Sequence, residues 1–156
     1  NKLYWNMYKN ISIIFFLIFL FFNVASGQGL QNLVQNLPEG TELTIRKEIN
    51  VPANNSVVEL VKTDSYEVDN FKSLVLTMRM SATERVIQKN TTFTINRVEY
   101  IAKRDRQEGT YKVKLYYGNK REFFIFYFYP EQRPKIESLS PYFKINLPKA
   151  GKYDSN

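Results

Sequence analysis

The sequence predicts an all-β protein, an antiparallel β-sandwich of about seven strands, with a small closed β-barrel as the alternative. Along much of the chain, apolar residues alternate with polar ones, which is the period of a strand with one buried face. Turn-forming Gly, Pro and Asn residues separate these runs. The chain also holds 12 Phe and 11 Tyr among its 156 residues, and aromatic residues are enriched in strands.

The predicted strands follow one another along a single β domain. The first, 41–51, lies between a Pro-Glu-Gly turn and a Pro-Ala-Asn-Asn turn, and Lys47 interrupts its alternation. In another, 91–103, the apolar residues stand at odd positions in the first half and at even positions in the second half. This change predicts a β-bulge near Asn96 and Arg97. The remaining predicted strands are 57–61, 74–80, 111–117, 121–129 and 142–147.

The N-terminal segment has the features of a secretory signal peptide. From the expected start at Met7, a short charged region with Lys9 precedes the apolar run 11–22, and small residues follow at 24–27. The apolar run is shorter than the roughly 20 residues that span a bilayer as a helix. We therefore expect a signal-peptide helix that crosses the membrane transiently and a secreted or periplasmic protein, with N-terminal membrane anchoring as the alternative. The predicted segments are 1–27 as signal peptide, 28–40 as lead-in, 41–147 as the β domain and 148–156 as a frayed tail.

The chain contains neither cysteine nor histidine. Disulfides and thiolate metal sites are excluded, and the commonest general base and zinc ligand are missing. Asp64, Glu67 and Asp69 share one polar loop, but their spacing matches no established calcium-binding loop. We therefore predict no enzymatic activity, no cofactor and no metal site, with a carboxylate-based hydrolase as a less favoured alternative. A small exported domain without disulfides is typical of the bacterial envelope or of bacterial secretion.

The net charge favours anionic partners weakly. The full chain carries +7, and the predicted signal segment holds two lysines and no acidic residue, which leaves +5 for the rest. Nucleic acid is not expected as a partner of an exported chain with this modest charge. The stretch 97–121 is rich in Lys and Arg, and both a basic stripe and a solvated turn of mixed charge fit it.

The hairpin 111–129 is the most informative part of the sequence. A two-residue turn at Gly118-Asn119 would place Val113 opposite Phe124 and leave one face of the hairpin dry. A three-residue turn would instead move the aromatic residues of the second strand to the other face. In the two-residue arrangement the second face combines ammonium groups with aromatic rings, and its candidate ligand-binding residues are Lys112, Lys114, Tyr116, Phe123 and Tyr127.

Two interpretations of this face remain open. In the first, the lysine stems cover apolar surface while their ammonium groups reach water. In the second, the face docks an anionic glycan, a lipid head group or another envelope protein. The stretch 123–129 is apolar on both parities, which is typical of a central strand buried on both sides. We predict an exported, non-catalytic binding or interaction module. The alternative is a structural subunit that self-assembles through edge strands, with 121–129 at the contact.

Overall fold

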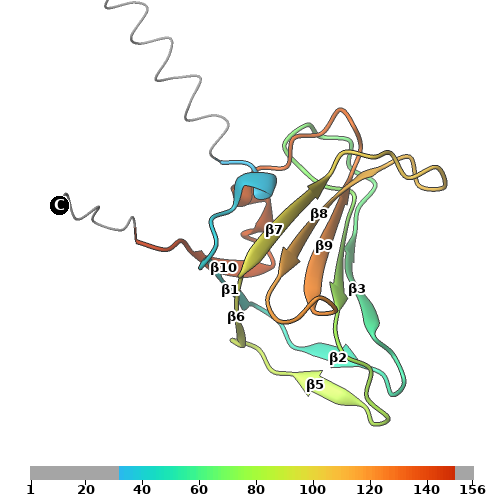
Figure 1. Cartoon of the computed structure of the whole chain (residues 1–156), viewed down its shortest axis with the longest axis vertical. Helices are drawn as coiled ribbons and strands as arrows, with labels where there is room; N and C mark the ends of the chain where they lie inside the picture. The colour runs from blue at the N-terminus through green and yellow to red at the C-terminus, as the bar shows by residue number, and fades with distance from the viewer. Residues whose placement is uncertain (1–31, 150–156) are drawn as a thin grey trace, which may run out of the picture. The chain divides into compact units, whose positions relative to one another are not determined.

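The protein is built around a five-stranded antiparallel sheet, with the strand order β3-β4-β9-β8-β7 (Figure 1). The computed structural model describes residues 32–149. In this sheet the strands are β3 (Val57–Lys62), β4 (Ser73–Thr77), β9 (Phe123–Phe128), β8 (Tyr111–Tyr116) and β7 (Arg97–Ile101). A three-stranded sheet contains β10 (Phe143–Asn146), β1 (Glu42–Ile45) and β6 (Thr92–Thr94), and a two-stranded sheet pairs β2 (Ile49–Val51) with β5 (Arg85–Ile87). All pairings are antiparallel, and the all-β prediction is confirmed.

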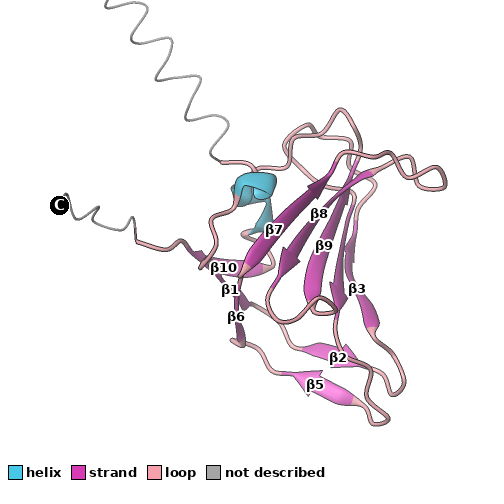
Figure 2. Ribbon diagram, in the orientation of Figure 1, coloured by secondary structure: helices cyan, strands magenta, loops and turns pink. Residues whose placement is uncertain are grey.

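Helical structure in the described residues is confined to two 3-10 turns, η1 (Val34–Asn36) and η2 (Ile136–Leu139) (Figure 2). Among these residues, none of the helical segments has the length and apolar character required to cross a bilayer. The predicted signal peptide at 1–27 lies outside the described residues, as does most of the predicted C-terminal tail.

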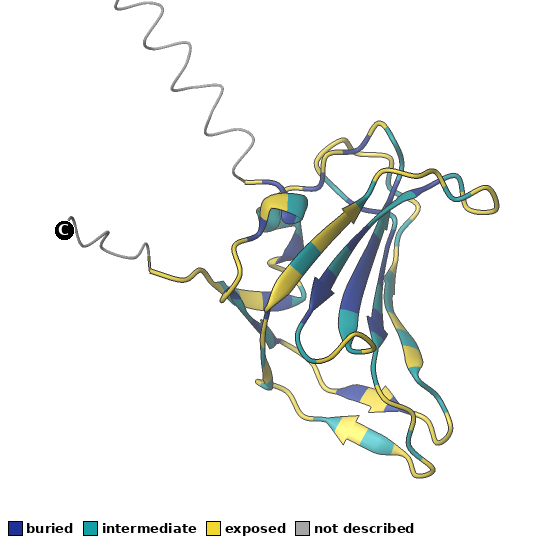
Figure 3. Ribbon diagram, in the orientation of Figure 1, coloured by how far each residue is buried: buried dark blue, intermediate teal, exposed yellow. Residues whose placement is uncertain are grey.

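The core lies between the five-stranded sheet and the smaller elements that cover its inner face (Figure 3). Phe124 of β9 is fully buried, and its ring lies 5.1 Å from that of Phe93 and 5.2 Å from that of Phe143, both from the three-stranded sheet. Leu139 of η2 and Val34 of η1 are buried in the same cluster. Aromatic rings therefore hold the layers of the sandwich together.

Two predicted strands are split, because the chain passes from one sheet to another within them. The run 41–51 bends at Arg46 and leaves the three-stranded sheet for the two-stranded one. The run 91–103 crosses from β6 to β7 at the buried Ile95, and Asn96 Nδ2 donates to the carbonyl of Gly118 at 3.0 Å. The predicted bulge near Asn96 is therefore wrong, since the change of parity marks a crossing between sheets. Strand β5 was not predicted.

The hairpin of β8 and β9 has a longer turn than predicted. Val113 pairs with Phe126 and Leu115 with Phe124, and the Tyr117 amide donates to the Glu122 carbonyl at 3.2 Å. The predicted two-residue turn and the predicted pairing of Val113 with Phe124 are therefore wrong. The observed register is displaced from the predicted one by two positions. Because an even displacement preserves the parity of a strand, the predicted division of residues between the two faces is still correct.

Strand β9 is the central strand of the five-stranded sheet, hydrogen-bonded to β4 on one side and to β8 on the other. Burial on both faces explains why this stretch is apolar on both parities. It also means that the stretch 121–129, expected at a self-assembly contact, offers no free strand edge. The free edges of this sheet are β3, which is bulged between Glu59 and Val61, and β7, which carries Arg97 and Glu99. Bulges and charges on edge strands oppose pairing with another chain.

Candidate functional site

The five candidate residues share the outer face of the five-stranded sheet, opposite the core. Lys112 pairs with Tyr127 across the two strands, and Tyr116 pairs with Phe123. Lys114 lies between them on β8. The structure therefore brings the predicted residues together on one surface.

Cations cover the aromatic rings of this face. The Lys112 Nζ lies 5.6 Å from the ring centroid of Tyr127, and the Lys114 Nζ lies 4.9 Å from that of Phe123. The guanidinium carbon of Arg97 lies 3.9 Å from the ring centroid of Tyr116. Such contacts hold a cation over the negative face of a ring. Part of the aromatic surface is thus already occupied by side chains of the protein.

Tyr116 is covered rather than available to a ligand. Its side chain is 5% exposed, and its hydroxyl donates to Glu99 Oε2 at 2.8 Å. Burial, and then the hydrogen bond to the Glu99 carboxylate, raise the pKa of Tyr116 above its ordinary value. Tyr116 therefore acts here as a neutral hydrogen-bond donor that holds β7 against β8.

The Lys112 end of the outer face is neutralised by the loop between β7 and β8. Lys112 Nζ forms an ion pair with Asp105 Oδ2 at 3.2 Å, and Lys72 Nζ forms one with Glu108 Oε2 at 2.7 Å. Amide hydrogen bonds from Gln107 and Glu108, followed by the Lys112 ammonium, hold the pKa of Asp105 below its usual range. A cleft of about 270 Å³ at this end is lined by both acidic and basic residues. Its three carboxylates outnumber its two lysines, so the lining does not favour an anion.

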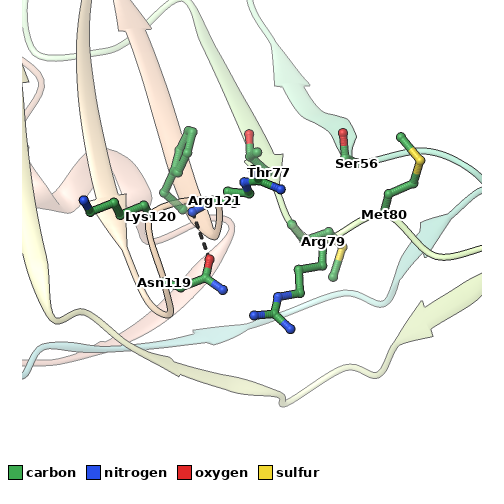
Figure 4. A pocket seen from close by; sticks show the side chains of 9 residues that line it. Ser56, Thr77, Arg79, Met80, Asn119, Lys120 and Arg121 are labelled. Carbon is green, nitrogen blue, oxygen red and sulfur yellow. Dashed lines mark hydrogen bonds between the residues drawn. The ribbon is translucent and has the colours of Figure 1, made fainter.

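The opposite end of the same face holds a cleft of about 850 Å³ (Figure 4). It lies where β4 ends, beside the turn that joins β8 to β9. Among residues 32–149, three cationic side chains and no carboxylate line it. The lining residues are Ser56, Thr77, Met78, Arg79, Met80, Asn119, Lys120, Arg121 and Phe123.

Strand pairing positions the basic residues of this cleft. Thr77 pairs with Phe123, so the end of β4 lies beside the start of β9. Arg79 comes two residues after Thr77 in the sequence. The amide of Arg121 donates to Asn119 Oδ1 at 2.9 Å, which fixes the turn, and Figure 4 shows the Arg121 side chain extending toward Thr77. Two separate segments therefore bring their cations to one opening.

The cations of the cleft have no ion-pair partner within residues 32–149. The ion pairs of this part of the chain are those of Lys72, Lys112 and Lys135. Glu122, the carboxylate nearest in sequence to Arg121, accepts a hydrogen bond from the Asn119 amide at 3.3 Å and does not line the cleft. The cleft is thus a cationic surface without an internal counter-charge.

Of the predicted candidates, Phe123 alone lines this cleft, and Lys114 lies over its ring. Arg79 and Met80 were missed as site residues, because they follow β4, a strand distant in sequence from the hairpin. Lys120 and Arg121 do belong to the stretch 97–121, whose richness in Lys and Arg is evident from the sequence. Only the pairing of β4 with β9 shows which of these cations meet Arg79.

In the described part of the chain, no three Asp or Glu side chains are arranged to hold a metal ion. Comparison of the chain with protein-family models, with curated proteins and with solved structures gives no match.

Proposed function

We propose that this protein is an exported, non-catalytic binding module that holds an anionic ligand in the cleft between the end of β4 and the β8–β9 turn. The observation that carries the proposal is the set of three cations, Arg79, Lys120 and Arg121, that line one cleft without a carboxylate. Export rests on the signal-peptide pattern at the N-terminus. The non-catalytic character rests on the absence of histidine and cysteine.

The chemistry of the cleft suits an anion that bears several oxygen atoms. A guanidinium group donates two parallel hydrogen bonds to a phosphate, sulfate or carboxylate group. Because the three cations repel one another and lack partners in the described residues, a bound anion removes an unfavourable interaction. The Phe123 ring adds an apolar wall against which the body of a ligand can pack.

The double variant Arg79→Gln with Arg121→Gln tests the proposal. Retention on a sulfated-glycan column and co-sedimentation with phosphatidylserine-containing vesicles are measured at low salt, where electrostatic binding is strongest. We expect a loss of about fivefold in affinity for each cation removed. The matched control is Arg104→Gln with Arg106→Gln, which removes the same charge from exposed positions in the β7–β8 loop. Equal retention of both double variants would contradict the proposal.

A third variant shows how far the ligand extends along the sheet. Lys112→Glu with Lys114→Glu reverses the charges of the outer face but leaves the cleft lining intact. A ligand that continues from Phe123 toward Tyr127 would lose affinity in this variant as well. A ligand confined to the cleft would respond only to the Arg79 and Arg121 changes.

A further inference from the structure

Exposed apolar side chains flank the cationic cleft. Met80, which lines the cleft, is 65% exposed, and Val57, which pairs with Thr77, is 48% exposed. Two backbone hydrogen bonds fix them at the same end of the domain: the Asn54 amide donates to the Ser81 carbonyl at 2.7 Å, and the Met78 amide donates to the Ser56 carbonyl at 2.9 Å. The exposed apolar groups are thus held beside the cations by the backbone.

This combination distinguishes between classes of anionic partner. A sulfated glycan would use the cations of the cleft but would gain little from an exposed methionine and valine. The surface of an anionic bilayer interacts favourably with both kinds of group, because cations approach the phosphates while apolar side chains enter the boundary between head groups and acyl chains.

We infer that this end of the domain docks on the surface of an anionic lipid membrane. Arg79, Lys120 and Arg121 contact lipid phosphates, and Met80 and Val57 enter the head-group region. This inference rests on the proposed function, and it specifies lipid phosphate as the anion that the cleft binds. Charge complementarity at the cleft and the uncovered side chains of Met80 and Val57 at the same end of the domain support this occupant.

The test replaces the apolar side chains and leaves every charge in place. Met80→Gln with Val57→Thr is compared with the unaltered protein for binding to vesicles of phosphatidylserine and phosphatidylcholine, and for retention on a sulfated-glycan column. Val57→Thr keeps a β-branched residue on its strand. We expect vesicle affinity to fall about tenfold, since the removed groups bury apolar surface at the membrane, and retention on the glycan column to change far less, since Arg79, Lys120 and Arg121 keep their charges.

The matched control is Val68→Thr with Leu147→Gln. Val68 is 58% exposed and Leu147 is 49% exposed, and neither lines the cleft. This control should bind vesicles like the unaltered protein. Because Met80 is exposed, Met80→Gln alone provides the same comparison if the double variant is unstable.

The possible failures are separable. If the Met80 and Val57 variant binds vesicles like the unaltered protein, membrane docking is refuted while anion binding stands. If the unaltered protein is retained by the glycan column but not by anionic vesicles, the partner is a polyanion and the inference is also refuted. If Arg79→Gln with Arg121→Gln leaves both measurements unchanged, the proposed function itself fails.

Discussion

Replacing Phe124 with alanine tests the packing that joins the layers of the sandwich. Phe124 is fully buried on β9 and faces the three-stranded sheet. Its ring centroid lies 5.1 Å from that of Phe93, 5.3 Å from that of Tyr117 and 5.2 Å from that of Phe143. The substitution therefore removes a side chain on which rings from the three-stranded sheet and from the β8–β9 turn converge.

The expected loss is large for a domain of this size. Truncation of a buried Phe to Ala costs about 3–5 kcal/mol, which combines lost apolar burial with the cavity that remains. Each aromatic pair adds about 0.5–1.5 kcal/mol beyond area burial, so three pairs place Phe124 toward the upper end of that range. The adjacent Phe123 lies half-buried on the outer face, and its replacement by alanine should cost only about 1–2 kcal/mol.

Equilibrium urea unfolding, followed by far-ultraviolet circular dichroism, measures both variants. A domain with a free energy of unfolding of about 5–15 kcal/mol can be unfolded outright by Phe124→Ala. Phe124→Leu keeps much of the apolar volume and should lose about 1–2 kcal/mol, which keeps the comparison measurable. Equal losses for Phe123→Ala and Phe124→Ala would refute the placement of Phe124 between the sheets.

Two further predictions concern the loops at the end of the sheet opposite the cationic cleft. Gln132 is 1% exposed, accepts a hydrogen bond from the Tyr129 amide at 2.8 Å and donates one to the Glu67 carbonyl at 3.0 Å. Because Gln132→Leu leaves these backbone groups without their partner, it should lower the free energy of unfolding by about 2 kcal/mol in urea denaturation. A change below about 0.5 kcal/mol would contradict this role. The lowered pKa of Asp105 means that its carboxylate stabilises the loop above its unfolded pKa, and that this contribution disappears as the pH falls through the folded pKa. The Gln107 amide donates to Asp105 Oδ1 at 2.9 Å, so its NMR chemical shift should follow the titration of that carboxylate. The inflection should lie at a pH below the ordinary aspartate pKa of about 3.9. An inflection at or above that value would count against the contact.

Local periodicity was sufficient to predict the class of the fold, because strands such as β1 and β8 bury alternate residues against the core. It was also sufficient to assign the faces of β8 and β9, since a register displaced by two positions preserves parity. One short strand escaped prediction. Strand β5 has three residues, and its pattern of burial leaves all of them partly or fully exposed, so its sequence carries no apolar alternation.

The passage of the chain between sheets produced a pattern that resembled a bulge. Ile95 is buried between β6 and β7, and the parity of the apolar residues changes there because the next strand belongs to a different sheet. A bulge and a crossing both shift parity by one position. The two could be distinguished only by the strands with which each half pairs, which is information distant in sequence.

The cationic cleft escaped prediction for a related reason. Arg79 follows β4 and Arg121 precedes β9, and the pairing of Thr77 with Phe123 is what brings the two segments together. Neither strand contains a local pattern that identifies the other as its partner. The aromatic and basic residues of the hairpin, including Lys120 and Arg121, could be recognised from the sequence, but their neighbour Arg79 could not.

The positions of the carboxylates decide which end of the outer face stays cationic. The β7–β8 loop supplies Asp105 and Glu108 to neighbouring lysines, whereas Glu122 beside the β8–β9 turn accepts a hydrogen bond from the backbone of that turn. Gly118 makes this arrangement possible, because a Cβ at that position would overlap the Glu122 carboxylate. A larger residue at Gly118 would displace Glu122 from the turn and free its negative charge to approach the cleft. The glycine thus helps to keep the Glu122 carboxylate away from the cleft as well as to shape the turn.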